Sequence, residues 1–147
     1  MEIDDGRAGM ASDPSTYDLI VLDAFSSSAI PVHLLTLEAL ETYLDRLGPE
    51  GVILVHVTNH YVDLHGPLAA AAETLQLEAR ARDFEPDRNA IPERAFVAGS
   101  RWVVLARGTA GLASAGATGP GWGPLQPRRD VRVWTDDYAN PLATYRW

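Results

Sequence analysis

The type and position of Asp23 make it a candidate for chemistry. Residues 19–22 form a short, continuous apolar run, which predicts a strand buried on both faces of a parallel sheet. Asp23 follows this run directly, and three serines at 26–28 come next. Ligands of open α/β sheets gather outside the carboxyl ends of the strands, where a carboxylate can hold a cation or accept a proton. A plain turn at Asp23 is the alternative, because Asp is a favoured turn residue.

Polar side chains also gather at a second apolar run, residues 52–57, and these are His56, Thr58, Asn59, His60 and Tyr61. His56, His60 and His65 together suggest a metal site. However, no helix is expected through His56, and no pair of carboxylates lies nearby in the sequence. Ordinary hydrogen bonds are favoured for these histidines, and we expect no metal. The serines at 26–28 beside His33 suggest a Ser–His hydrolase, which would need elbow glycines and an orienting acid that the sequence lacks.

Composition narrows the class of protein. A chain of 147 residues is of single-domain size, and the absence of Cys excludes disulfides and thiolate sites and suits a reducing compartment. No apolar segment approaches the roughly 20 residues of a membrane span, so we expect a soluble, cytoplasmic protein with no membrane contact. The net charge of −8 disfavours nucleic acid as a partner and favours small cations such as amines.

Helical patterns follow both apolar runs. Thr36 is the predicted N-cap of a helix with leucines at helical spacing, which residues 48–49, Gly-Pro, are expected to end. Asp63 is expected to cap a second helix over residues 64–77, where Pro67 is tolerated in the first turn. The first of these helices is predicted to pack on the sheet.

The second half of the chain predicts two further strands and two less regular segments. Residues 77–84 alternate apolar and charged side chains, as a half-exposed strand near a sheet edge does, and residues 102–106 form another strand. No helix is predicted between them, so they should be antiparallel neighbours. Residues 108–127, rich in Gly, Ala and Pro, predict a flexible loop, whereas the aromatic tail at 131–147 is expected to dock on the domain.

The order of elements predicts the fold. Residues 4–7, Asp-Asp-Gly-Arg, suggest the end of a strand running into a turn. The order strand, helix, strand, helix, strand, strand that follows is half of a doubly wound α/β domain ending in an antiparallel pair. We therefore expect residues 1–147 to form one partial Rossmann-like domain.

Four stretches of the chain carry a resemblance to a known family. They are Asp4-Asp5-Gly6-Arg7, YDLIVLDAFSSSAIPVHLLT at 17–36, GVILVHVTNHYVDL at 51–64, and WTDDY at 134–138. With these stretches the chain resembles the C-terminal half of the class I S-adenosylmethionine-dependent methyltransferase fold, and more closely the spermidine synthase family. The resemblance covers most of the chain apart from residues 108–127.

The resemblance implies roles for particular residues. Asp5 and Gly6 match the pair that binds the adenine of the nucleoside co-substrate, and Asp23 matches the acid that receives the attacking amine. The family places a second acid three residues later, where this chain has Ser26, and fused relatives often place one at Ser28. The resemblance places Asn59 and Tyr61 in the amine-facing loop. The other residues expected to bind the substrate are Ser26, Ser28 and His56. Asp136 and Asp137 in the docked tail are candidates for the missing acid, with a solvated turn as the alternative.

The activity that this resemblance implies is aminopropyl transfer from decarboxylated S-adenosylmethionine to a small amine. A second carboxylate would bind the far ammonium group of a diamine, and Ser26 stands in its place here. Methyl transfer from S-adenosylmethionine is therefore the alternative within this class. The family's Gly-rich turn and ribose-binding acid have no counterpart in these 147 residues, so we expect weak or absent co-substrate binding without an N-terminal half. A non-catalytic α/β module is the other alternative, and an open sheet edge predicts a homo-oligomer or a complementing half.

Overall fold

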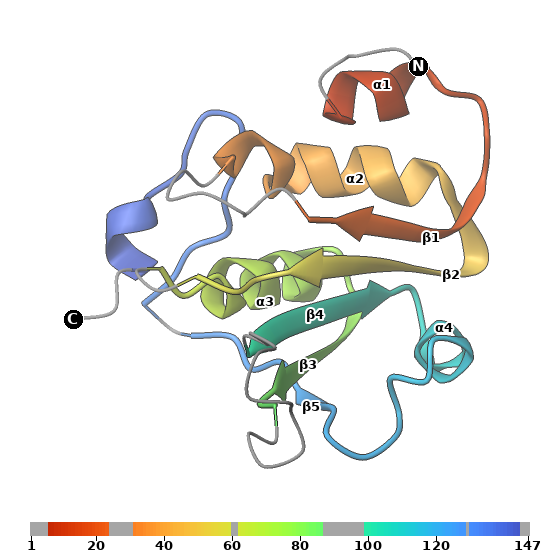
Figure 1. Ribbon diagram of the computed structural model, residues 1–147. Helices are drawn as coiled ribbons and strands as arrows, with labels where there is room; N and C mark the ends of the chain where they lie inside the picture. Colours follow the sequence, from red (N-terminus) through yellow and green to blue (C-terminus); the bar gives the residue numbers. More distant parts are fainter. Residues whose placement is uncertain (1–5, 24–30, 60–61, 87–98, 129, 145–147) are drawn as a thin grey trace, which may run out of the picture.

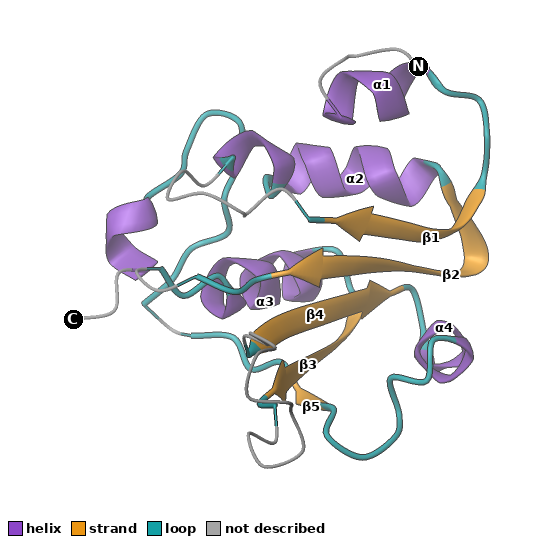
Figure 2. Cartoon of the chain, in the orientation of Figure 1, coloured by secondary structure: helices purple, strands orange, loops and turns teal. Residues whose placement is uncertain are grey.

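The computed structural model describes residues 6–23, 31–59, 62–86, 99–128 and 130–144. In chain order the elements are α1 (Gly6–Ser12), β1 (Tyr17–Leu22), η1 (Val32–Leu34), α2 (Leu37–Asp45), β2 (Leu47–His56), α3 (His65–Thr74), β3 (Glu78–Phe84), β4 (Ser100–Ala106), α4 (Thr109–Ser114), β5 (Gly123–Pro124) and η2 (Pro141–Thr144). The strands form one sheet in the order β1-β2-β4-β3-β5 (Figures 1 and 2).

The sheet combines a parallel pair with antiparallel strands. β1 and β2 are parallel and are joined through α2, whereas β4 lies antiparallel between β2 and β3. A parallel crossover unit extended by an antiparallel pair is a partial Rossmann-like α/β fold, which confirms the expected fold class. The carboxyl ends of β1 and β2 therefore lie side by side.

Side chains alternate between the two faces of the sheet along β2 and β4. Ile53 and Val55 belong to the main core with α2 and α3, whereas Val52 and Leu54 pack in a smaller cluster with Leu112 of α4. The alternation follows from the two-residue period of a strand. One face is therefore covered by two helices and the other by a single short helix.

β1 departs from the prediction of burial on both faces. Ile20 is buried in the main core, whereas Leu19 and Val21 on the opposite face are 51% and 49% exposed. The prediction is wrong for this face because no described element packs over β1 there. The continuous apolar run identifies the strand but does not show whether both of its faces are covered.

The helix after β1 begins where the sequence predicts and ends earlier. Thr36 accepts a hydrogen bond at 3.3 Å from a backbone amide of the first turn of α2, which confirms it as the N-cap. α2 ends at Asp45, and residues 48–49 lie inside β2 rather than ending the helix. Leu47 already pairs with Tyr17 of β1, so the sheet takes up this segment before the Gly-Pro signal is reached.

The second helix is shorter than predicted, and its cap differs. α3 runs from His65 to Thr74 with Leu64 at the N-cap position, while Asp63 accepts a hydrogen bond at 3.1 Å from the backbone amide of His65. Asp63 therefore caps the helix from the position before the N-cap, and not from the N-cap position itself. Pro67 lies in the first turn, as predicted.

Residues 108–127 contain regular structure, contrary to the prediction of a loop. They hold α4 and β5, and Leu112 and Ala117 are buried against the sheet. The small residues that suggest a loop here permit a close approach, because a Cβ on Gly111 would lie 3.0 Å from the carbonyl oxygen of Glu50. Close packing of a short helix on β2 therefore explains the glycine at position 111.

α1 and residues 134–136 of the tail meet at the start of α2. Gly6 and Arg7 lie in α1 and not in the predicted turn, because the following segment is helical. Trp134 of the tail is 1% exposed, and its carbonyl oxygen accepts a hydrogen bond at 2.8 Å from the amide of Leu37. The tail therefore docks on the domain, as its aromatic content predicts.

Candidate functional site

Asp23 and His56 form a pair at the carboxyl ends of the two parallel strands. Leu22 of β1 is in register with Val55 of β2, so the residue that follows each lies beside the other. Asp23 Oδ1 lies 2.7 Å from His56 Nδ1, which is hydrogen-bonding distance. The parallel register thus brings together two residues that are 33 positions apart in the sequence.

The ring of His56 is held from a second side by an aromatic residue. Trp102 is the antiparallel partner of His56 on β4, and the two rings stack with centroids 4.6 Å apart and an interplanar angle of 24°. The indole Nε1 donates to Ser100 Oγ at 3.1 Å, which fixes the orientation of the indole. His56 is therefore oriented by a carboxylate at Nδ1 and by an aromatic surface on its face.

The contacts define what the pair can do chemically. With Nδ1 donating to Asp23, Nε2 of the neutral imidazole carries the lone pair. Nε2 is buried and has no hydrogen-bond partner among the described residues. Asp23 has a side chain that is 58% exposed, and its Oδ2 makes no hydrogen bond to the described part of the chain. The pair therefore presents one open carboxylate oxygen at the surface, while the lone pair of the imidazole lies below it.

The other predicted site residues are placed differently. Asn59 Oδ1 accepts a hydrogen bond at 3.0 Å from the amide of Val62, so this side chain supports the turn after β2. The residues predicted to bind amine or adenine that lie outside the described residues are Asp5, Ser26, Ser28 and Tyr61. Their roles stay predictions.

Asp136 is engaged in a separate cluster at the start of α2. Its two carboxylate oxygens accept hydrogen bonds from Arg7, both at 2.7 Å, and Thr36 Oγ1 donates to Oδ1 at 2.7 Å. The Arg7 guanidinium and then the Thr36 hydroxyl lower the pKa of Asp136 to about 2. Asp137 is exposed in the adjoining turn. Asp136 thus joins α1 to α2, and neither acid contacts the Asp23–His56 pair.

Gly6 begins α1, and its backbone is open, because a Cβ built on it would meet no other heavy atom of the described residues within 4 Å. Among all the described residues, no group of three or more His, Asp or Glu residues is arranged to hold a metal ion. No described helix is long and apolar enough to cross a membrane.

Sequence reasoning identified Asp23 and His56 separately and missed their pairing, and it missed Trp102 as part of the site. The available signal was topological: strands predicted as parallel neighbours place the residues after their apolar runs side by side. The stack on Trp102 depends on the antiparallel register of β4 against β2, which a single sequence does not specify.

Comparisons with known proteins add little to this geometry. No family model matches the chain, and no curated protein matches it. Among solved structures, the chain is similar to the crystal structure of MnmC2 from Aquifex aeolicus, with 16% identity and a TM-score of 0.44. The match covers 71% of this chain and 28% of that one, so the chain spans less than a third of the length of that protein.

Proposed function

We propose that this chain is the acceptor half of a spermidine synthase-like aminopropyltransferase, in which Asp23 binds a small amine and accepts its proton while His56 holds the carboxylate in place. The observation that carries the proposal is the 2.7 Å contact between Asp23 Oδ1 and His56 Nδ1 at the carboxyl ends of parallel strands. A carboxylate that is held in place can bind an ammonium group and act as a general base.

The roles of the two residues follow from their contacts. Asp23 Oδ2 would hold the ammonium form of the amine in a charge-assisted hydrogen bond, and the same carboxylate would accept the proton that the amine loses before it attacks the donor. His56 Nδ1 donates to Oδ1 and would keep the carboxylate in place, so His56 acts as a positioning residue.

The donor in this proposal is decarboxylated S-adenosylmethionine, for which the sequence carries no Gly-rich turn and no ribose-binding acid. The proposal therefore assigns most of the donor site to a complementing N-terminal half. Methyl transfer from S-adenosylmethionine to an amine is the second candidate. It is favoured by the presence of one open carboxylate at the pair, because a monoamine needs no second acid at its far end.

Calorimetric titration with putrescine and with propylamine tests the acceptor role directly. We expect saturable amine binding to the full chain, weakened at least fivefold by Asp23→Asn and by His56→Gln. Asp137→Asn is the matched control, since it removes the same charge from an exposed turn away from the pair. Absence of binding up to millimolar amine, or an equal loss in the control, would overturn the proposal.

Parallel titrations separate the two transfer reactions. Decarboxylated S-adenosylmethionine, S-adenosylmethionine and methylthioadenosine are added to the amine-saturated chain together with a complementing N-terminal half, and products are followed by mass spectrometry. Aminopropylated product that is lost in Asp23→Asn supports the first reaction, and methylated product supports the second.

A further inference from the structure

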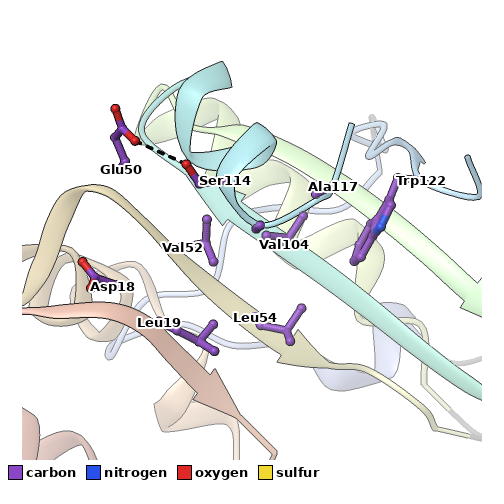
Figure 3. Close-up of a pocket in the computed structure, with 10 residues that line it drawn as sticks. Asp18, Leu19, Glu50, Val52, Leu54, Val104, Ser114, Ala117 and Trp122 are labelled. Carbon is purple, nitrogen blue, oxygen red and sulfur yellow. Dashed lines mark hydrogen bonds between the residues drawn. The ribbon is translucent and has the colours of Figure 1, made fainter. Parts of the chain in front are cut away.

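The face of the sheet opposite α2 and α3 carries an apolar groove. Its volume is about 470 Å³, and it runs across β1, β2 and β4 toward the segment after α4 (Figure 3). The residues that line it are Asp18, Leu19, Glu50, Val52, Leu54, Val104, Ser114, Ala115, Ala117 and Trp122. Leu19 is half exposed, and Val21, two residues further along the same face of β1, continues the apolar surface beyond the groove.

Two carboxylates give this groove a polarity. Figure 3 shows Asp18 and Glu50 on one side and Trp122 on the opposite side. Glu50 accepts a hydrogen bond from Ser114 Oγ at 3.3 Å, and neither acid forms an ion pair with a described residue. An apolar floor with unneutralised acids at one end is complementary to an apolar segment that carries a cation at its corresponding end.

The sheet has room for a further layer at this position. Parallel strands are normally covered on both faces, and β1 is covered by described elements on one face only. β1 is also the edge of the sheet, with β2 as its one strand neighbour in the described chain. An exposed apolar face that adjoins an open edge marks a binding surface for another polypeptide.

We propose that this groove binds an amphipathic helix of a partner polypeptide, whose apolar face covers Leu19, Val21 and Leu54 and whose Lys or Arg pairs with Asp18 and Glu50. A helix supplies the layer that β1 lacks and fits the groove in the manner of other helix-in-groove interfaces. A second copy of this chain is a poorer occupant, because each copy carries a net charge of −8 and the copies repel. The proposal does not depend on the amine site.

A designed peptide is the probe. We use a fluorescein-labelled helical peptide of about 18 residues, roughly 27 Å long, with leucines on one face and two lysines at one end. Its control replaces the lysines by glutamates. Fluorescence anisotropy with the full chain should show saturable binding of the lysine peptide and at least tenfold weaker binding of the glutamate peptide.

Two variants locate the binding, with one matched control. Asp18→Asn with Glu50→Gln, and separately Leu19→Thr with Val21→Thr, should each weaken the lysine peptide at least fivefold. Glu41→Gln with Glu73→Gln removes the same charge from exposed positions on α2 and α3 and should change binding less than twofold. Circular dichroism confirms that each variant is folded.

Three results would overturn the proposal. The first is equal binding of the two peptides, and the second is an equal effect of the groove variants and the control. The third is a different occupant: a dimer in light scattering that Leu19→Thr with Val21→Thr dissolves, or saturable binding of phenethylamine in calorimetry without binding of the peptide.

Discussion

The two faces of the sheet differ in how they are covered, although the same strands build both. On one face, α2, α3 and the docked tail enclose a core that contains Ile53, Leu105 and Trp134, all 1% exposed or less. On the other, α4 covers β4 and part of β2, while Leu19 and Val21 of β1 stay half exposed. A fold of this kind can therefore be stable through one face and leave the other available for binding.

Truncation of a core residue on the covered face should have the largest effect. Leu105→Ala creates a cavity in the main core and should lower the free energy of unfolding by about 3 kcal/mol. Leu54→Ala on the opposite face should cost about 1 kcal/mol, because this side chain is already partly exposed. Urea denaturation followed by circular dichroism measures both, and equal losses would contradict the difference between the faces.

The cap of α2 should have the next largest effect. Thr36→Ala removes the acceptor for the first-turn amide and the donor to Asp136, and we expect a loss of about 1–2 kcal/mol. Thr36→Ser keeps the hydroxyl and should lose less than half as much. If the two variants unfold at the same urea concentration, the methyl packing of Thr36 and not its hydrogen bonds matters.

The ion pair between the ends of the chain should appear in the pH dependence of stability. The pKa of Asp136 is about 2 in the folded chain, lowered from its ordinary value of 3.8 by Arg7 and then by Thr36. Its contribution is therefore present above about pH 4 and is lost as the pH falls toward 2. Asp136→Asn should flatten this part of the stability profile, whereas Asp137→Asn should leave it unchanged, as measured by thermal melts from pH 2 to 6.

The smallest effect is expected on the open face. Leu19→Thr with Val21→Thr keeps β-branched or strand-compatible side chains and should change the free energy of unfolding by about 0.5 kcal/mol or less. The same variant should bind less of the dye ANS, because the exposed apolar surface is reduced. A loss near that of Leu105→Ala would mean that this face is part of the core.

The sequence predicted much of the fold from local signals. The apolar runs, the N-cap at Thr36 and the alternation over residues 77–84 identify elements that the structure contains. The end of α2 is different, because the pairing of Leu47 with Tyr17 depends on the sheet and overrides the Gly-Pro signal. The helix at 109–114 was not predicted, and the reason is related. Its Gly111 suggests a loop in the sequence, whereas in the structure this glycine lets the helix approach β2 closely.

The candidate site was predictable in its residues and not in its contacts. Asp23 and His56 each follow or end an apolar run, which is a local property of the sequence. Their pairing depends on parallel register, and the role of Trp102 depends on antiparallel register. The contact of Asp136 was not predictable either, because its partner Arg7 is 129 positions away and no local signal connects the two residues.

The attachment of α1 has a practical consequence for handling this chain. α1 has no buried residue, and its contacts include Arg7 on Asp136, the partly buried Met10 against the main core, and Arg46, which donates to the carbonyl oxygens of Met10 and Ala11 at 3.2 and 3.0 Å. Deletion of the tail from residue 131 onward would remove the ion-pair partner of Arg7 and the carbonyl oxygen that accepts from the amide of Leu37. Shortened versions of this chain should therefore keep residues 131–144 if α1 is to stay attached as described.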